Sequence, residues 1–76
     1  SQQMNYSKSI QDYEKELKES KKKYEKLLKQ MKKARTEYHY YNLSDEAELL
    51  YEDIADLQMR ITDLRKQKKL AEIDAV

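Results

Sequence analysis

The chain has 76 residues and a formal net charge of +1, so it forms at most one small domain. It contains no Gly, Pro, Cys, Trp or Phe, which excludes disulfides, thiolate chemistry and glycine-rich phosphate-binding loops. No apolar run approaches the roughly 20 residues of a membrane-spanning helix, and no signal-peptide core is present. We therefore expect a soluble, cytoplasmic protein without enzymatic activity. Met4 is a candidate natural first residue.

The first half of the chain carries an apolar stripe with heptad spacing. Alternate steps of four and three residues reach Tyr6, Ile10, Tyr13, Leu17, Ser20, Tyr24, Leu27, Met31, Ala34, Tyr38 and Tyr41. Only Ser20 is neither apolar nor aromatic. A stripe sustained over about five heptads is typical of a coiled-coil seam, and it predicts a helix over about 5–41. Because six Tyr lie on or beside this seam, and each buried hydroxyl needs a partner or water, we expect it to be only partly sealed.

A phase break separates this stripe from a second one. The second seam runs through Ala47, Leu50, Ile54, Leu57, Ile61, Leu64, Lys68 and Ala71. Its phase differs by two residues, which one continuous coiled coil does not absorb easily. The residues Asn42-Leu43-Ser44-Asp45 lie at the break, where Asn can end a helix and Ser44 can cap the next one. We predict a turn at 42–45 and a second helix over about 45–73.

A short connection makes neighbouring helices antiparallel. The predicted fold is therefore all-α: an antiparallel two-helix coiled-coil hairpin, spanning residues 1–76 as a single domain. A parallel dimer of nearly continuous helices is the alternative, if the break only kinks the chain. Leu70 and Ile73 fall outside the second seam, which favours a fraying end.

Two helices in contact along one stripe cannot bury their seam side chains completely. A second copy would supply the missing surface, so we expect two hairpins to dimerise into a four-helix bundle. A different protein could supply the missing helices instead. The expected arrangement resembles small hairpin regulators that dimerise into four-helix bundles, a resemblance of architecture alone.

Charges are segregated along the chain. Folding about position 43 would place residue i opposite roughly residue 86 − i. The acidic stretch 45–56 would then face Lys32, Lys33 and Arg35. The basic segments 17–29 and 57–69 would face each other and repel modestly.

Two groups of side chains are candidate binding sites. Tyr is enriched at binding hot spots, so we expect a protein-docking surface formed by Tyr38, Tyr40, Tyr41, Tyr51, Glu48 and Glu52. In the alternative interpretation, Tyr38 and Tyr41 are seam residues. A basic helical face can bind nucleic acid, and the candidates are Lys21, Lys22, Lys26, Arg65, Lys66 and Lys69. A solvated coiled-coil surface is the simpler explanation of those lysines.

The single His, His39, has Arg35, Thr36, Asn42 and Leu43 at the helical spacings that a metal site would use. We therefore expect no metal, no cofactor and no small-molecule substrate. The favoured function is a protein-interaction module acting as a small adaptor, inhibitor or regulatory subunit. A nucleic-acid-binding regulator and a structural component of a larger assembly are the alternatives.

Overall fold

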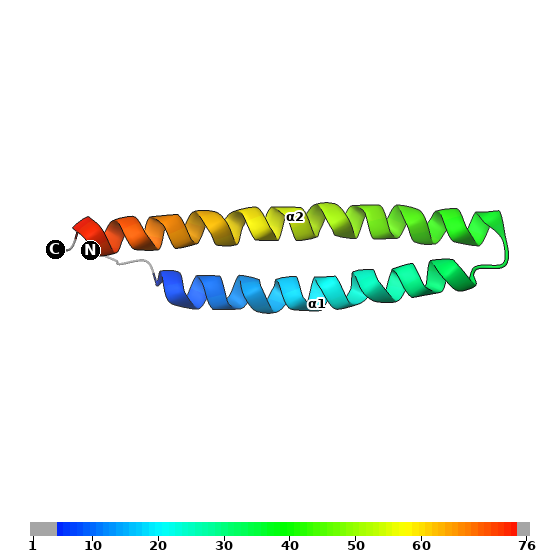
Figure 1. Ribbon diagram of the computed structural model, residues 1–76, viewed down its shortest axis with the longest axis horizontal. Coiled ribbons are helices and arrows are strands. Elements are labelled where there is room, and N and C mark those ends of the chain that lie inside the picture. Colours follow the sequence, from blue (N-terminus) through cyan, green and yellow to red (C-terminus); the bar gives the residue numbers. More distant parts are fainter. Residues whose placement is uncertain (1–4, 75–76) are drawn as a thin grey trace.

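The computed structural model describes residues 5–74 as two helices, α1 (Tyr6–Lys33) and α2 (Glu37–Asp74). They lie side by side and antiparallel in a rod with extents of 60 × 18 × 14 Å (Figure 1). The predicted all-helical architecture of two helices is confirmed, and the described region contains no strand. Neither helix has a stretch that is both long and apolar enough to cross a bilayer. The interpretation of Met4 as the natural start lies outside the described residues.

The predicted turn at 42–45 is wrong. Helix α2 continues without interruption through Asn42 and Asp45, and the chain reverses earlier, at Ala34-Arg35-Thr36. The predicted helix bounds of about 5–41 and 45–73 change accordingly, to 28 residues for α1 and 38 for α2. The second arm is therefore the longer one, the reverse of the expected order.

The chain reverses at 34–36 without a residue of positive φ anywhere in the described region. Ala34 leaves the helix in an extended conformation (φ −64°, ψ 132°), while its N–H still donates to the carbonyl of Met31 at 3.2 Å. Two residues later, Thr36 Oγ1 accepts the backbone N–H of His39 at 3.1 Å. A Thr hydroxyl in this position caps a helix start. Thr36 therefore begins α2, and the predicted cap Ser44 lies within the helix.

The start of α1 is also capped locally. Asn5 Oδ1 accepts the backbone N–H of Lys8 at 3.1 Å and caps α1. Lys32 and Lys33 occupy the last turn of α1, and Glu37 occupies the first turn of α2. Each of these charges has the sign that its helix dipole favours, so the charge pattern supports a reversal between 33 and 37.

The apolar stripe of the first half belongs to α1 only as far as Ala34. Tyr38 and Tyr41 continue its spacing by coincidence, because they lie in α2 and are 80% and 61% exposed. The alternative in which they are seam residues is also wrong. Tyr6, Tyr13 and Tyr24 do lie on the seam and are half-buried, as a partly sealed seam predicts.

Leu27, Leu43 and Ala47 form the buried cluster beside the turn, with Tyr24, Met31, Ala34 and Leu50 packed around it. Tyr24 lies against Tyr51, and Arg60 lies over the ring of Tyr13, which sets a register in which residue i lies opposite roughly residue 74 − i. The predicted register of 86 − i is wrong, since it depended on the later turn. In the observed register Leu27 lies opposite Ala47 of the same buried cluster, so a large side chain faces a small one, which allows close packing.

The core extends along most of α2 but remains thin. Its buried side chains are Ile10, Leu27, Leu43, Ala47, Ile54, Leu57 and Ile61, and no large side chain in the described region is completely buried. The predicted seam of the second helix is therefore confirmed from Ala47 to Lys68. It also includes Leu43, whereas the predicted seam residue Ala71 is exposed. Helix α2 reaches Asp74, so Leu70 and Ile73 are helical and exposed rather than frayed.

Candidate interaction surfaces

The register places opposite charges across the hairpin. Residues 17–29 of α1 contain six Lys and two Glu, and they lie opposite roughly 45–57 of α2, which contain six acids and no basic residue. The predicted juxtaposition of the two basic segments is wrong. Residues 57–69 instead lie opposite roughly 5–17, where two Lys and three acids nearly cancel. Charge therefore stabilises the hairpin along most of its length.

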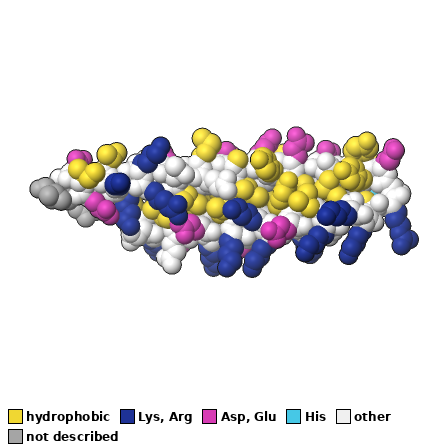
Figure 2. All heavy atoms as spheres, in the orientation of Figure 1, with side chains coloured by type: hydrophobic (Ala, Val, Ile, Leu, Met, Phe, Trp, Pro, Cys, Tyr) yellow, Lys and Arg dark blue, Asp and Glu magenta, His cyan; other side chains and the backbone are white. Residues whose placement is uncertain are grey.

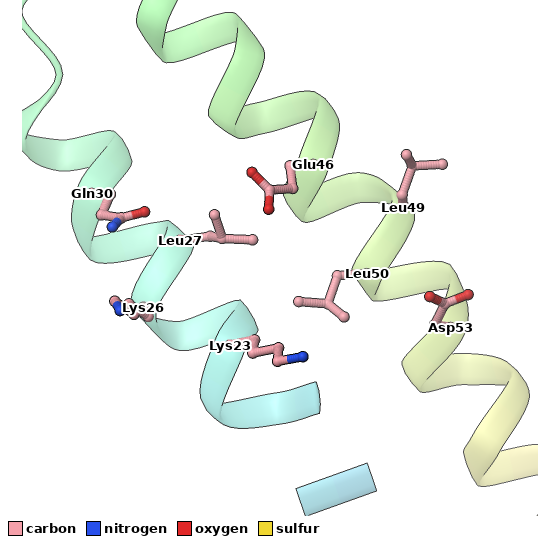
Figure 3. A pocket seen from close by; sticks show the side chains of 8 residues that line it. All are labelled: Lys23, Lys26, Leu27, Gln30, Glu46, Leu49, Leu50 and Asp53. Atoms are coloured by element: carbon pink, nitrogen blue, oxygen red, sulfur yellow. The ribbon is translucent and has the colours of Figure 1, made fainter. Parts of the chain in front are cut away.

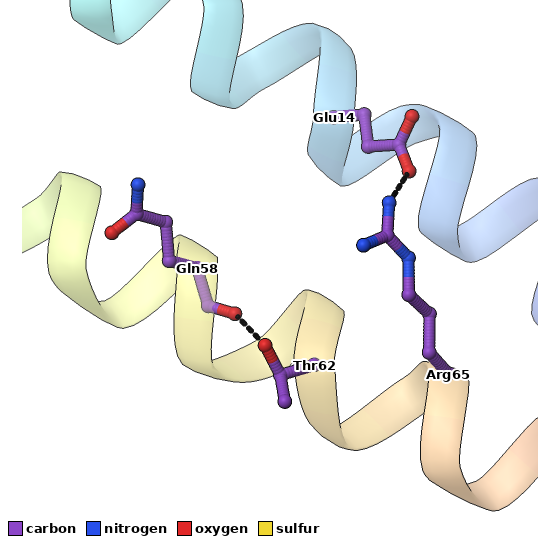
Figure 4. Close-up of polar contacts among 4 residues, drawn as sticks. All are labelled: Glu14, Gln58, Thr62 and Arg65. Carbon is purple, nitrogen blue, oxygen red and sulfur yellow. Dashed lines mark hydrogen bonds and ion pairs between the residues drawn. The ribbon is translucent and has the colours of Figure 1, made fainter.

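Two specific contacts join the helices far from the turn. Arg65 Nη2 lies 2.6 Å from Glu14 Oε1 (Figure 4). Both side chains are about half exposed or more, so the pair contributes only about 0.2–1 kcal/mol. The guanidinium carbon of Arg60 lies 5.9 Å from the ring centroid of Tyr13, a cation–π geometry. Tyr13 is thereby partly covered by α2.

The outer face of α1 is a lysine ridge. Lys8, Lys15, Lys22 and Lys29 recur every seven residues and are all exposed. Lysines on the adjacent helical positions widen the ridge, which we define as Lys8, Lys15, Lys18, Lys22, Lys26, Lys29, Lys32 and Lys33. In Figure 2 the basic side chains follow the lower edge of the rod, along α1. Apolar residues do not interrupt this ridge, so it is suited to charged partners.

The outer face of α2 is different in kind. Two residues along an α-helix rotate the side chain by about 200°, so the positions two residues before the seam positions of α2 point away from α1. Steps of three and four along this face define the α2 outer stripe: Tyr38, Tyr41, Asp45, Glu48, Glu52, Ala55, Met59, Thr62, Lys66, Lys69 and Ile73. Leu49 and Leu70 flank it and are 65% and 60% exposed. Acidic and apolar side chains gather on this upper edge in Figure 2.

Local bonding makes the stripe less polar than its composition indicates. The Thr62 hydroxyl donates to the carbonyl of Gln58 at 2.9 Å (Figure 4). This bond satisfies the hydroxyl within the helix, so Thr62 can present its methyl group to a partner. Met59, three residues before it, is 70% exposed.

The six residues predicted to bind a protein partner divide into two groups. Tyr38, Tyr41, Glu48 and Glu52 lie on the α2 outer stripe. Tyr40 lies seven residues before the buried Ala47 and therefore on the seam face of α2, and Tyr51 lies at the edge that meets α1. The rings of Tyr40 and Tyr41 meet edge to face, with centroids 5.8 Å apart. The ring of Tyr51 instead packs on Tyr24 of α1, at 5.9 Å. The aromatic side chains therefore extend along α2 and do not form one compact patch.

The six residues predicted to bind nucleic acid are not brought together. Lys21, Lys22 and Lys26 belong to α1, while Arg65, Lys66 and Lys69 lie near the other end of the rod, opposite roughly 5–9. At 1.5 Å per residue the two groups are roughly 20 Å apart along the axis. Sequence reasoning also missed Lys8, Lys15 and Lys29, although their seven-residue spacing was visible.

An open groove of about 460 Å³ lies between the helices near the turn (Figure 3). Leu27 and Leu50 form its floor, and Leu49 points outward from its rim. Lys23, Lys26 and Gln30 line the α1 side, and Glu46 and Asp53 line the α2 side. The groove holds no nucleophile paired with a base, and the described residues contain no group of three side chains able to hold a metal ion.

No family model, no curated protein and no solved structure matches this chain. The function is therefore argued from the two outer faces of the hairpin.

Proposed function

We propose that the chain is a non-enzymatic protein-interaction module, a small adaptor, inhibitor or regulatory subunit that binds helical protein surfaces through α2. One observation supports this above all. Eight large apolar side chains on α2 are exposed, against one on α1: Tyr38, Tyr40, Tyr41, Leu49, Tyr51, Met59, Leu70 and Ile73, compared with Leu28. Exposed apolar side chains collected on one element and rimmed by charge are typical of an interaction site.

The thin core supports association with further helices. A two-helix hairpin gives each helix a single buried stripe, and among residues 5–74 this one leaves no large side chain completely buried. Docking a second helical pair on α2 would remove water from Tyr41, Leu49 and Met59, with a gain of about 25 cal/mol per Å² of apolar area. A second copy of the chain, which would give a four-helix arrangement, is accordingly one candidate for the partner.

The proposal is tested with a photo-crosslinking residue. A benzophenone amino acid in place of Tyr41 reports contacts of the α2 outer stripe, and the same residue in place of Lys15 is the control on the outer face of α1. We expect discrete adducts, to the chain itself or to one protein, from position 41 but not from position 15. Leu49→Glu should reduce binding of the purified chain to that protein at least tenfold, since it places a charge in an apolar contact. Adducts that form equally from both positions, or none from position 41, would contradict the proposal.

The lysine ridge favours a second candidate function, a nucleic-acid-binding regulator. Eight lysines on one helical face, against Asp12, Glu19 and Glu25, form a long basic strip, and such strips bind phosphate backbones. The test is fluorescence anisotropy with a labelled duplex at several salt concentrations. Replacing Lys15, Lys22 and Lys29 by Gln should reduce the log–log salt slope by about 0.9 for each lost phosphate contact.

The matched control neutralises Lys66 and Lys69, which lie on α2 at the far end of the rod. Binding should survive this change if the ridge is the contact surface. Absence of binding to duplex DNA or RNA at low salt would eliminate this candidate. A third candidate, a structural piece of a larger assembly, predicts weak far-UV circular dichroism of the isolated chain, which strengthens when its neighbour is added.

A further inference from the structure

The α2 outer stripe has a charge order that reverses along its length. Asp45, Glu48 and Glu52 occupy the half near the turn, and Lys66 and Lys69 occupy the half near the C-terminus. Apolar side chains lie near the two ends of the stripe, at Tyr41 and Ile73, and at its centre, at Ala55 and Met59. A stripe of this kind is complementary to its own reversed copy.

We propose that the partner of this stripe is a second copy of the chain, bound antiparallel about a two-fold axis through α2. The inference rests on the proposed function, and it commits the stripe to one occupant. Residue i of one α2 would lie opposite roughly residue 114 − i of the other. The alternation of three and four residues then brings stripe positions together in pairs, as in the seam of an antiparallel coiled coil.

From Tyr41 to Ile73, the stripe pairs in this register are compatible. The two acid–base pairs are Asp45 with Lys69 and Glu48 with Lys66, and the two-fold axis makes each occur twice. The apolar pairs are Tyr41 with Ile73 and Ala55 with Met59. Glu52 meets Thr62, whose hydroxyl already donates within its own helix.

The flank adds one favourable and one unfavourable pair. Flank side chains pair about five positions off this register, the offset that Arg65 has from Glu14 in the hairpin. Leu49 then lies beside Leu70 of the second copy, and both are more than half exposed in the hairpin. Asp56 and Asp63 also face each other, which places like charges together at the solvent-accessible rim. One exposed repulsion is small compared with the pairs along the stripe, which spans roughly 48 Å at 1.5 Å per residue.

The competing arrangements of two copies are disfavoured by charge. A parallel α2 pair would place Asp45, Glu48 and Glu52 against the same residues of the other copy. Contact through α1 would place the lysine ridge against itself, without an apolar side chain to compensate. Antiparallel contact through α2 avoids both the acid–acid and the lysine–lysine repulsion. It leaves the two lysine ridges on the outer edges of the dimer.

The test is a charge-swap cycle on the full chain, followed by sedimentation equilibrium. Both Glu48 and Lys66 are exposed and take part in no ion pair within the described residues. We expect the wild type to dimerise, and Glu48→Lys or Lys66→Glu alone to weaken the dimer about tenfold or more, because each creates two like-charge pairs. The double variant Glu48→Lys/Lys66→Glu should recover dimerisation to within about threefold, since it restores both pairs in reversed order.

Lys22→Glu, on the lysine ridge, is the control and should leave the dimer unchanged. Far-UV circular dichroism confirms that each variant remains helical. A wild type that stays monomeric at about 1 mM, or a double variant no stronger than the single ones, would overturn the inference. Adducts from position 41 to a different protein, with a monomeric wild type, would refute the dimer and leave the proposed function standing.

Discussion

Arg65 Nη2 of α2 lies 2.6 Å from Glu14 Oε1 of α1, although the two residues are 51 positions apart in the sequence. This contact is far from the turn. In the observed register Glu14 lies opposite roughly residue 60, and Arg65 reaches it from five residues further along α2. A turn at 42–45 would have placed Glu14 opposite roughly residue 72 instead. The ion pair is therefore closer to the observed register than to the predicted one.

A double-mutant cycle on this pair should give a small coupling energy. Glu14→Gln and Arg65→Gln are expected to be non-additive by about 0.2–1 kcal/mol in urea unfolding, the range for exposed pairs. The coupling should shrink in about 1 M salt, because the charges are accessible to screening ions. Additive effects at low salt would indicate that the two side chains do not meet in solution.

Thr36→Ala should destabilise the hairpin by about 1 kcal/mol, because the Thr36 hydroxyl is the acceptor for the first turn of α2. Thermal unfolding followed by far-UV circular dichroism would measure the loss. Ser44→Ala is the matched control, since Ser44 lies within α2 and Ala is the better helix former. It should be neutral or slightly stabilising. The reverse ranking of the two variants would place the turn at 42–45 after all.

Leu27→Ala should cost about 2–3 kcal/mol of unfolding free energy, near the low end for a core Leu because two helices enclose it only partly. Leu27 is 8% exposed in the cluster with Ala47, whereas its neighbour Leu28 is 37% exposed. Leu28→Ala should therefore cost less than half as much in the same urea titration. Equal costs would mean that α1 packs on a different face.

Sequence reasoning identified the two helices and most of their buried faces, but not their junction. The heptad stripe from Tyr6 to Ala34 and the stripe from Ala47 to Lys68 were both visible, because a buried face imposes its period on many residues. The turn constrains only a few residues and leaves a much weaker pattern in the sequence. Tyr38 and Tyr41 happened to continue the first stripe, while Thr36 gave the only local cap signal at the true reversal.

The candidate sites were harder to predict, because they depend on register. A shift of the turn changes every cross-helix neighbour, so the basic segments expected to face each other lie opposite acids and a nearly neutral segment. Tyr51 was expected in a patch with Tyr40 and Tyr41, yet its ring packs on Tyr24. By contrast, the outer stripe of α2 could have been recognised from the sequence, as the positions that lie two residues before those of the α2 seam.

Asp63→Lys should strengthen self-association, the opposite of what most surface substitutions do. Asp63 is exposed on the rim of the α2 outer stripe, where it would face Asp56 of a second copy. The substitution turns both symmetry-related repulsions into acid–base pairs, and we expect the dimer dissociation constant to fall about threefold to tenfold at low salt. Sedimentation equilibrium at two salt concentrations would measure it, with Asp12→Lys on the outer face of α1 as the control for added positive charge. A dissociation constant that is unchanged, or lowered equally by Asp12→Lys, would show that the copies do not meet through this face.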